Sequence, residues 1–198
     1  MRTLSIICCS VLRREVEVFA LQEYPEAELV FLDSMLHMHP ETLRQTIDAA
    51  LAARQDRDCL LVYGDCHAHM HETGRRPHCA RTSAVNCGEL LLGREAYRSF
   101  RNERVFLFLP EWIERWREVF IKELGFSDQS LAREFMQESQ RRLVYLDTGL
   151  IPVPEKTLEE IAGYFGMPVD VLAVSLNELH QAVHLAVQHL QTGDSHEG

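Results

Sequence analysis

The chain has 198 residues, of which 46% are hydrophobic and 25% charged; this composition is typical of a globular domain with a buried core and excludes bulk disorder. Its 30 acidic and 20 basic side chains give a formal net charge of −10 with neutral histidines. An acidic chain without a basic stripe argues against nucleic acids and anionic membranes, so we expect neither as a partner.

Apolar runs typical of buried strands alternate along the chain with helical patterns. In chain order we expect a strand at 4–8, a helix at 11–24, a strand at 28–32, a helix at 40–54, a strand at 59–63, a long functional loop at 64–86, a helix at 88–100, a strand at 104–109, helices at 111–124 and 128–141, a strand at 143–146, a helix at 154–165, a strand at 170–174 and a helix at 176–190.

This order of elements indicates the fold class. Continuous apolar strands, each followed by a helix, are typical of a mostly parallel sheet that is covered by helices on both faces. We therefore predict a single α/β domain over residues 1–191, with a Rossmann-like three-layer architecture. The polar residues 192–198 are expected to form a flexible C-terminal tail.

All six cysteines lie in the first half of the chain: Cys8, Cys9, Cys59, Cys66, Cys79 and Cys87. A secreted disulfide framework would come with a signal peptide, but the first apolar run is short and Arg13 and Arg14 follow it at once. No later apolar run approaches the length of a membrane span. We expect a cytoplasmic protein in a reducing compartment, where cysteines are buried, metal-bound or catalytic rather than bridged.

Cysteine and histidine side chains gather where the predicted strands end. The set comprises Cys8 and Cys9 after the first strand, His37 and His39 beyond the second, Cys66, His67, His69 and His71 after the third, and Cys87 at the start of the next helix. Because ligands of open parallel sheets bind at the carboxyl ends of the strands, these groups are expected to converge on one edge. Thiolate and imidazole are the ligands that zinc and iron favour. A helix N-terminus also stabilises a thiolate, which applies to Cys87 and Cys9.

The same residue types have simpler interpretations, which stay open at this point. A single cysteine at a strand end is about as often a buried structural thiol, and Cys59 opens an apolar strand and is assigned to the core. Cys8 and Cys9 alternate on one strand, so at most one of them faces the site. The loop histidines occupy every second position, which suits either a metal or a solvated loop. His180 and His184 lack the glutamate of a zinc-protease helix and fit a solvated helix face.

The loop at 64–86 also holds charged candidates. Its arginines, Arg75, Arg76 and Arg81, could receive a carboxylate or a phosphate, with Arg81 kept as a candidate for anion binding, although surface arginine is the more common interpretation. Asp65 and Glu72 are candidates for a general acid or base. The chain has no glycine-rich dinucleotide loop, Walker loop or Gly-x-Ser-x-Gly motif, which argues against nucleotide kinases and serine hydrolases.

Six segments carry a resemblance to a known family. They are residues 7–12 (Ile-Cys-Cys-Ser-Val-Leu), 36–40 (Leu-His-Met-His-Pro), 63–66 (Tyr-Gly-Asp-Cys), 86–97 (Asn-Cys-Gly-Glu-Leu-Leu-Leu-Gly-Arg-Glu-Ala-Tyr), 110–114 (Pro-Glu-Trp-Ile-Glu) and 146–149 (Leu-Asp-Thr-Gly). In this order they resemble the domain-of-unknown-function 1638 proteins of bacteria and archaea, over nearly the whole chain up to the final helix. Ser10 replaces a glycine of the family pattern, and Asn86 stands where aspartate is usual.

The resemblance implies a metal site formed by Cys9, His37, Cys66 and Cys87. Further candidates for a ligand or a base are Cys8, His67, His69 and Cys79; Cys79 and the extra loop histidines match no segment of the family. The resemblance also implies an association with corrinoid-dependent methyl transfer.

Three functional hypotheses follow, and the sequence leaves open whether the protein is an enzyme. The first is a metal-dependent enzyme of one-carbon or thiol metabolism that holds zinc or an iron–sulfur cluster and acts on a small molecule. The second is a non-catalytic accessory protein that carries a metal or cofactor to a corrinoid protein or methyltransferase. The third is metal-free catalysis, with Cys66 or Cys87 as the nucleophile and a loop histidine as the base. The oligomeric state is undetermined by the sequence.

Overall fold

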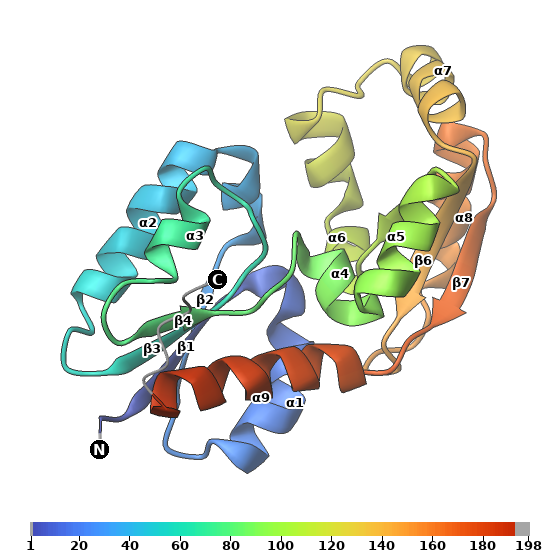
Figure 1. Cartoon of the computed structure of the whole chain (residues 1–198). Helices are drawn as coiled ribbons and strands as arrows, with labels where there is room; N and C mark the ends of the chain where they lie inside the picture. Colours follow the sequence, from blue (N-terminus) through green and yellow to red (C-terminus); the bar gives the residue numbers. More distant parts are fainter. Residues whose placement is uncertain (1, 193–198) are drawn as a thin grey trace. The chain divides into compact units, whose positions relative to one another are not determined.

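The computed structural model describes residues 2–192. These residues form seven strands in two sheets, and every strand pair is parallel (Figure 1). The predicted α/β class with parallel strands is therefore confirmed. The strands divide between two sheets instead of joining one, because an apolar run specifies a buried strand but not the strand beside it.

The chain divides into two compact units. Unit 1 comprises Met1–Leu91 and Leu176–Gly198, and unit 2 comprises Leu92–Ser175. The single domain over residues 1–191 stays a prediction. Of the predicted tail, Thr192 ends the last helix, and residues 193–198 lie outside the described residues.

The sheet of unit 1 has four strands in the order β2-β1-β3-β4. They are β1 (Leu4–Cys9), β2 (Glu28–Leu32), β3 (Asp58–Val62) and β4 (Cys79–Arg81). The two central strands, β1 and β3, are continuous apolar runs whose residues are almost all buried. In the register of this pair, Cys8 of β1 lies opposite Val62 of β3. Both strands therefore end at the same edge of the sheet.

Helices cover both faces of this sheet. The helical segments with residues in unit 1 are η1 (Ser10–Leu12), α1 (Arg13–Glu23), η2 (Ser34–Met38), α2 (Pro40–Ala52), α3 (Met70–Thr73), α4 (Cys87–Leu92) and α9 (Asn177–Thr192). Figure 1 shows α2 and α3 on one face and α1 and α9 on the other. Each long helix buries an apolar stripe, such as Leu43 and Ile47 of α2 or Leu179 and Val183 of α9. The three-layer arrangement expected from the sequence is thus present in this unit.

Unit 2 has a three-stranded sheet in the order β5-β6-β7. Its elements are α5 (Arg94–Asn102), β5 (Val105–Phe108), α6 (Pro110–Glu114), the π-helix η3 (Arg117–Glu123), α7 (Gln129–Ser139), β6 (Arg142–Asp147), α8 (Glu155–Phe165) and β7 (Val169–Ala173). Aromatic rings fill its core: the ring centroids of Phe108 and Phe120 are 5.3 Å apart, and those of Phe120 and Phe165 are 5.8 Å apart. Such edge-on and tilted ring contacts are favourable in a buried core.

Three sequence predictions need correction. The segment 64–86 is not a continuous loop, because it contains α3 and the edge strand β4; a three-residue strand is too short to show a period of two. The helix expected at 88–100 is interrupted at Gly93, whose φ of 76° is disfavoured for other residues. The helix expected at 111–124 divides into α6 and the π-helix η3.

Among residues 2–192, no helix combines the length and the apolar character that a membrane-spanning segment needs.

Candidate functional site at the carboxyl edge of the first sheet

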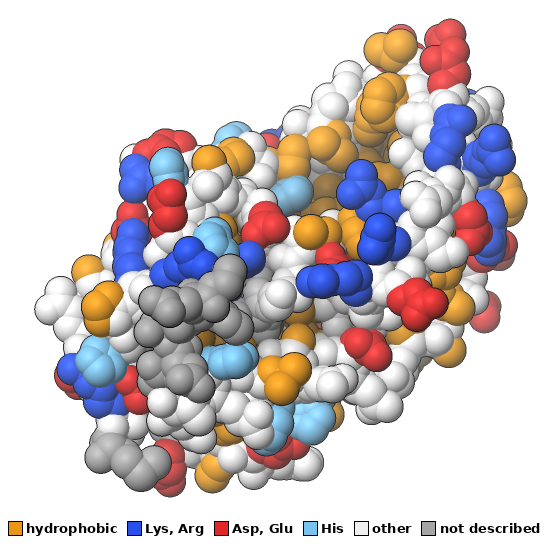
Figure 2. Space-filling view, in the orientation of Figure 1, with side chains coloured by type: hydrophobic (Ala, Val, Ile, Leu, Met, Phe, Trp, Pro, Cys, Tyr) orange, Lys and Arg blue, Asp and Glu red, His pale blue; other side chains and the backbone are white. Residues whose placement is uncertain are grey.

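All the cysteines and all the histidines of the chain fall within the sequence ranges of unit 1. Figure 2 shows several of the histidines at the surface. In the strand order β2-β1-β3-β4 the chain leaves the neighbours β1 and β3 in opposite directions, and ligands of open parallel sheets bind beyond the carboxyl ends of strands at such a point. Cys9 ends β1, and the segment 63–66 follows β3 directly. The candidate site is therefore built at this edge.

Gly64 brings two segments of the edge into contact. A Cβ atom at this position would lie 2.4 Å from the backbone of Asn86 and 2.4 Å from the carbonyl oxygen of Val85, so no side chain can be accommodated. The backbone N–H of Asp65 donates a hydrogen bond of 2.9 Å to that same carbonyl. This close approach explains the glycine of the Tyr-Gly-x-Cys pattern, since it places Cys66 and Cys87 on adjoining segments.

Side-chain caps hold the start of α4, where Cys87 lies. The N–H of Glu89 donates to Oδ1 of Asn86 over 3.0 Å, and the N–H of Val85 donates to Oε2 of Glu89 over 3.0 Å. This exchange is a close variant of the capping box. Asparagine and aspartate cap helices about equally well, so the departure from the family pattern at Asn86 keeps the local structure. Ser10, the other departure, accepts a 2.9 Å hydrogen bond from the N–H of Ser34.

Asn86→Ala is expected to lower the free energy of unfolding by about 1 kcal/mol, because the N–H of Glu89 loses its acceptor. Asn86→Asp keeps an acceptor at the same place and should stay within about 0.5 kcal/mol of the wild type. Urea unfolding followed by circular dichroism measures both changes. Equal stability of the two variants would contradict the capping role of Asn86.

The side chains of Cys9, Cys66 and Cys87 come together, and we call these three residues the thiol cluster. Cys9 and Cys87 are hydrogen-bonded to each other through their side chains, and Cys66 lies close enough to Cys9 for Cys9 to raise its pKa. All six cysteines of the chain are free thiols. Three residues from distant parts of the sequence thus lie near one another, and their role as metal ligands stays a prediction.

Two members of the thiol cluster, Cys66 and Cys87, are uncharged at neutral pH because their pKa values are raised. Burial, followed by the nearby Cys9, raises the pKa of Cys66 to about 11. The hydrogen bond with Cys9, followed by burial, raises the pKa of Cys87 well above its ordinary value. A buried thiol with a raised pKa is a poor nucleophile at neutral pH. A bound cation would reverse this effect, because it stabilises the thiolate.

Cys8 and Tyr63 lie beside the thiol cluster with different roles. The Cys8 thiol is fully buried and donates to the carbonyl oxygen of Cys9 over 3.2 Å, which agrees with the expectation that only one of the two neighbours faces the site. The Tyr63 side chain is 1% exposed, and its hydroxyl has no hydrogen-bond partner among residues 2–192. Burial raises the pKa of Tyr63, and the next largest effects come from Cys9, Cys8, Cys87 and Cys66. A buried hydrogen-bond donor therefore stands unused beside the sulfur atoms.

Three further candidates from the sequence are His37, Cys79 and His69. His37 lies on η2, where partial burial lowers its pKa; the main influences on the pKa values of Cys66 and Cys87 do not include it. Cys79 lies on β4 in register with Cys59, which is buried in the core as expected. His69 forms a 2.7 Å ion pair with Glu72 at the surface. The roles of these residues as metal ligands or bases stay predictions.

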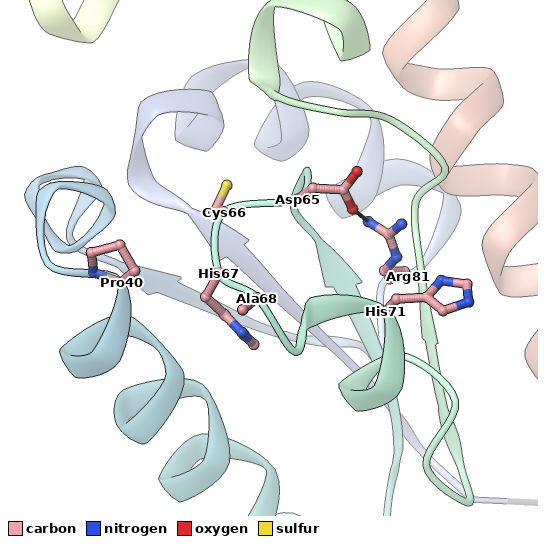
Figure 3. Close-up of a pocket in the computed structure, with 7 residues that line it drawn as sticks. All are labelled: Pro40, Asp65, Cys66, His67, Ala68, His71 and Arg81. Atoms are coloured by element: carbon pink, nitrogen blue, oxygen red, sulfur yellow. Dashed lines mark ion pairs between the residues drawn. The ribbon is translucent and has the colours of Figure 1, made fainter.

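A pocket of about 570 Å³ opens beside Cys66 (Figure 3). It is lined by Pro40, Asp65, Cys66, His67, Ala68, His71 and Arg81. His67 is 7% exposed, and its pKa is lowered by burial. Its Nδ1 accepts a 3.2 Å hydrogen bond from the N–H of His69, so the neutral ring carries its proton on Nε2, a buried atom without a partner. Cys66 thus belongs both to the thiol cluster and to the pocket.

Arg81, the predicted anion site, is already paired. Its Nη1 lies 2.8 Å from Oδ1 of Asp65, and Figure 3 shows the two side chains pointing toward each other. The aliphatic part of Arg81 packs against Gly74, where a Cβ atom would lie 2.8 Å from Cγ of the arginine. The sequence indicates Arg81 and Asp65 as separate candidates, and it predicts neither their pairing nor the buried hydroxyl of Tyr63, although the Tyr-Gly-x-Cys pattern contains the tyrosine.

The fold and the site together define an α/β protein with a cysteine-rich edge on a parallel sheet. Within residues 2–192, no three side chains of His, Cys, Asp or Glu stand in positions that could hold a metal ion as they are. The family model described as "Protein of unknown function (DUF1638)" matches residues 31–183, and the chain belongs to this family. No curated protein and no solved structure matches the chain.

Proposed function

We propose that the thiol cluster of Cys9, Cys66 and Cys87 binds a thiophilic metal, as zinc or an iron–sulfur cluster, and supports thiol or one-carbon chemistry on a small molecule in the adjoining pocket. The observation that carries this proposal is the convergence of three cysteines from three distant segments around an unpartnered, buried tyrosine hydroxyl. Sulfur ligands of this kind are those that zinc and iron favour.

The raised pKa values favour a metal over metal-free catalysis. Without a cation, the Cys66 and Cys87 thiols are protonated at neutral pH, whereas a nucleophilic cysteine needs a lowered pKa. Metal binding would replace the hydrogen bond between Cys9 and Cys87, because both sulfurs would lose their protons and turn toward a common centre. The site as described is thus the protonated state from which a metal site would form.

The residues of the chain have distinct roles in this proposal. The three cysteines would hold the metal, and three protein ligands leave one coordination position for a substrate. A metal held by these cysteines would supply the positive charge that stabilises a substrate thiolate at neutral pH. Tyr63 would donate its hydroxyl to a sulfur ligand, and Cys66 would connect the metal to the pocket. His37 remains a candidate for a fourth ligand.

Metal analysis of anaerobically purified protein tests the proposal. We expect about one equivalent of zinc, or the iron of one cluster, in the wild type, and its loss in Cys66→Ser and Cys87→Ser. Cys79→Ser is the matched control, because Cys79 lies on β4 beside Cys59, and it should retain the metal. Trace metal in the wild type that does not change in Cys66→Ser would reject the proposal. Metal binding without turnover, together with a co-purifying corrinoid methyltransferase, would favour the accessory role.

Tyr63→Phe is expected to have opposite effects on the two states of the protein. In the metal-free protein it removes a buried hydroxyl without a partner, so the free energy of unfolding should rise by about 1 kcal/mol. In the metal-bound protein it removes a hydrogen bond to a ligand, which should weaken metal binding about tenfold. Denaturation with and without chelator measures the first effect, and competition with a zinc indicator measures the second.

Tyr164→Phe is the contrast for this experiment. The Tyr164 hydroxyl donates to the carbonyl oxygen of Phe126, so its loss should destabilise the protein by about 1 kcal/mol and leave the metal affinity unchanged. A Tyr63→Phe protein that behaves like Tyr164→Phe would show that the Tyr63 hydroxyl has no function at the thiol cluster.

A further inference from the structure

The pocket beside Cys66 has its charged groups at one end. Asp65 and Arg81 form the ion pair described above, while Pro40 and Ala68 line other parts of the wall. In Figure 3 the ion pair lies on one side of Cys66, and Pro40 lies on the other. At about 570 Å³, the pocket is in the range of small-molecule sites, which is about 300–1,000 Å³.

The ion pair is fixed in place but still accessible. The Arg81 side chain is 17% exposed and that of Asp65 is 52% exposed. Arg81 is held by its packing on Gly74, and the backbone of Asp65 is held by the hydrogen bond to Val85. Each of the two groups can therefore contact a ligand without moving far. An arginine presents its N–H groups to a carboxylate, and an aspartate accepts from an ammonium group.

A ligand with a single charge fits this arrangement poorly. A simple anion that reaches Arg81 also meets the negative charge of Asp65, and a simple cation that reaches Asp65 meets Arg81. A ligand that carries both charges on one carbon atom satisfies both partners, so the pair selects a zwitterion by repelling singly charged competitors. Asp65 directly precedes Cys66, and Asp65, Arg81 and Cys66 all line the same pocket. A small ligand whose charged end is held by the ion pair therefore shares this pocket with the Cys66 thiol.

The geometry points to an α-amino acid with a thiol side chain as the ligand: its carboxylate contacts Arg81, its ammonium group contacts Asp65, and its sulfur points toward Cys66. The inference rests on the proposed metal site for the sulfur end only. The amino-acid end depends on Asp65 and Arg81, which belong to the protein whether or not a metal is bound.

Isothermal titration calorimetry under anaerobic conditions tests the inference with four probes. L-Homocysteine carries both charges and a thiol, cysteamine lacks the carboxylate and one methylene group, 3-mercaptopropionate lacks the ammonium group and one methylene group, and L-2-aminobutyrate lacks only the thiol. In zinc-treated wild-type protein we expect homocysteine to bind at least about tenfold more tightly than either singly charged thiol, which corresponds to one charge-assisted hydrogen bond. Equal affinities for the three thiols would overturn the inference.

Two matched variants separate recognition from a structural role of the ion pair. Asp65→Asn should weaken homocysteine about tenfold and strengthen 3-mercaptopropionate, because the repulsion of the carboxylate is removed. Arg81→Gln should weaken homocysteine as well but strengthen cysteamine. A uniform loss for all probes would mean that the pair only holds the loop, and would reject the inference.

Two outcomes distinguish a failure of this inference from a failure of the proposed metal site. L-2-Aminobutyrate should bind to chelator-treated wild-type protein, and Asp65→Asn should abolish this binding. That result supports the inference even if the protein holds no zinc. Full zinc content without any preference for zwitterions rejects the inference and leaves the metal proposal in place.

Discussion

Gly64→Ala is expected to lower the free energy of unfolding by about 3 kcal/mol or more, which is at the upper end of the range for overpacking. The added methyl group would lie 2.4 Å from backbone atoms of Val85 and Asn86, and backbone cannot rotate away as a side chain can. The two segments must separate, which breaks the hydrogen bond from Asp65 to Val85. Cys66 and Cys87 would move apart, so we also expect the loss of any bound metal.

Gly163→Ala is the matched control, because a Cβ atom at Gly163 in α8 meets nothing within 4 Å. This substitution inside a helix should stabilise the protein by about 0.5–1 kcal/mol. Far-UV circular dichroism during urea unfolding reports on the whole chain, whereas tryptophan fluorescence reports on unit 2, since Trp112 and Trp116 both lie there. A Gly64→Ala protein with an unfolding midpoint equal to that of the wild type would contradict the close approach of Gly64 to the backbone of Val85 and Asn86.

Zinc affinity is expected to rise at least about 100-fold between pH 6.5 and pH 7.5, because Cys66 and Cys87 must each release a proton and each proton contributes a factor of ten per pH unit, before any contribution of the third ligand, Cys9. Both thiols have raised pKa values, so both are protonated throughout this range. Protons therefore compete with the metal for the two sulfur atoms. The rise should continue in alkaline solution, since the pKa of Cys66 is about 11. Lower pH therefore weakens binding.

Competition with a chromophoric zinc chelator at a series of pH values measures this slope. Cys66→Ser should bind more weakly and also show a shallower slope, reduced by one factor of ten per pH unit, because one ionising ligand is lost. Cys79→Ser should reproduce the wild-type slope. A pH-independent affinity in the wild type would argue that these thiols are not the ligands.

The fold could be predicted where side-chain burial alone decides the structure. The apolar runs at 4–8 and 59–63 correspond to β1 and β3, because strands covered on both faces are apolar throughout. The edge strand β4 has the sequence Cys-Ala-Arg and pairs only with β3, so its strand character depends on a neighbour that is distant in sequence. Strand pairing in general depends on such distant neighbours, which explains why the strands form two sheets although the sequence predicts one.

The thiol cluster could be predicted because strand direction is a global property of a parallel sheet. Once β1 and β3 are parallel neighbours, Cys9 and Cys66 must lie at the same edge. The unpartnered hydroxyl of Tyr63 and the pairing of Asp65 with Arg81 could not be predicted in this way. They depend on the path of the segment between residues 64 and 86, which has no periodicity and is held by backbone contacts such as the one at Gly64.

The last helix has a consequence for synthesis of the protein. The helix α9 belongs to unit 1 and contacts β3 and β4, although all of unit 2 precedes it in the chain. On the ribosome, the first 91 residues would emerge with one face of these strands incompletely covered, and they would wait for roughly 5–20 seconds at about 5–20 residues per second until α9 is complete. A nascent chain that stops at Ser175 would lack this cover permanently, so we expect such a truncated product to aggregate or to be degraded.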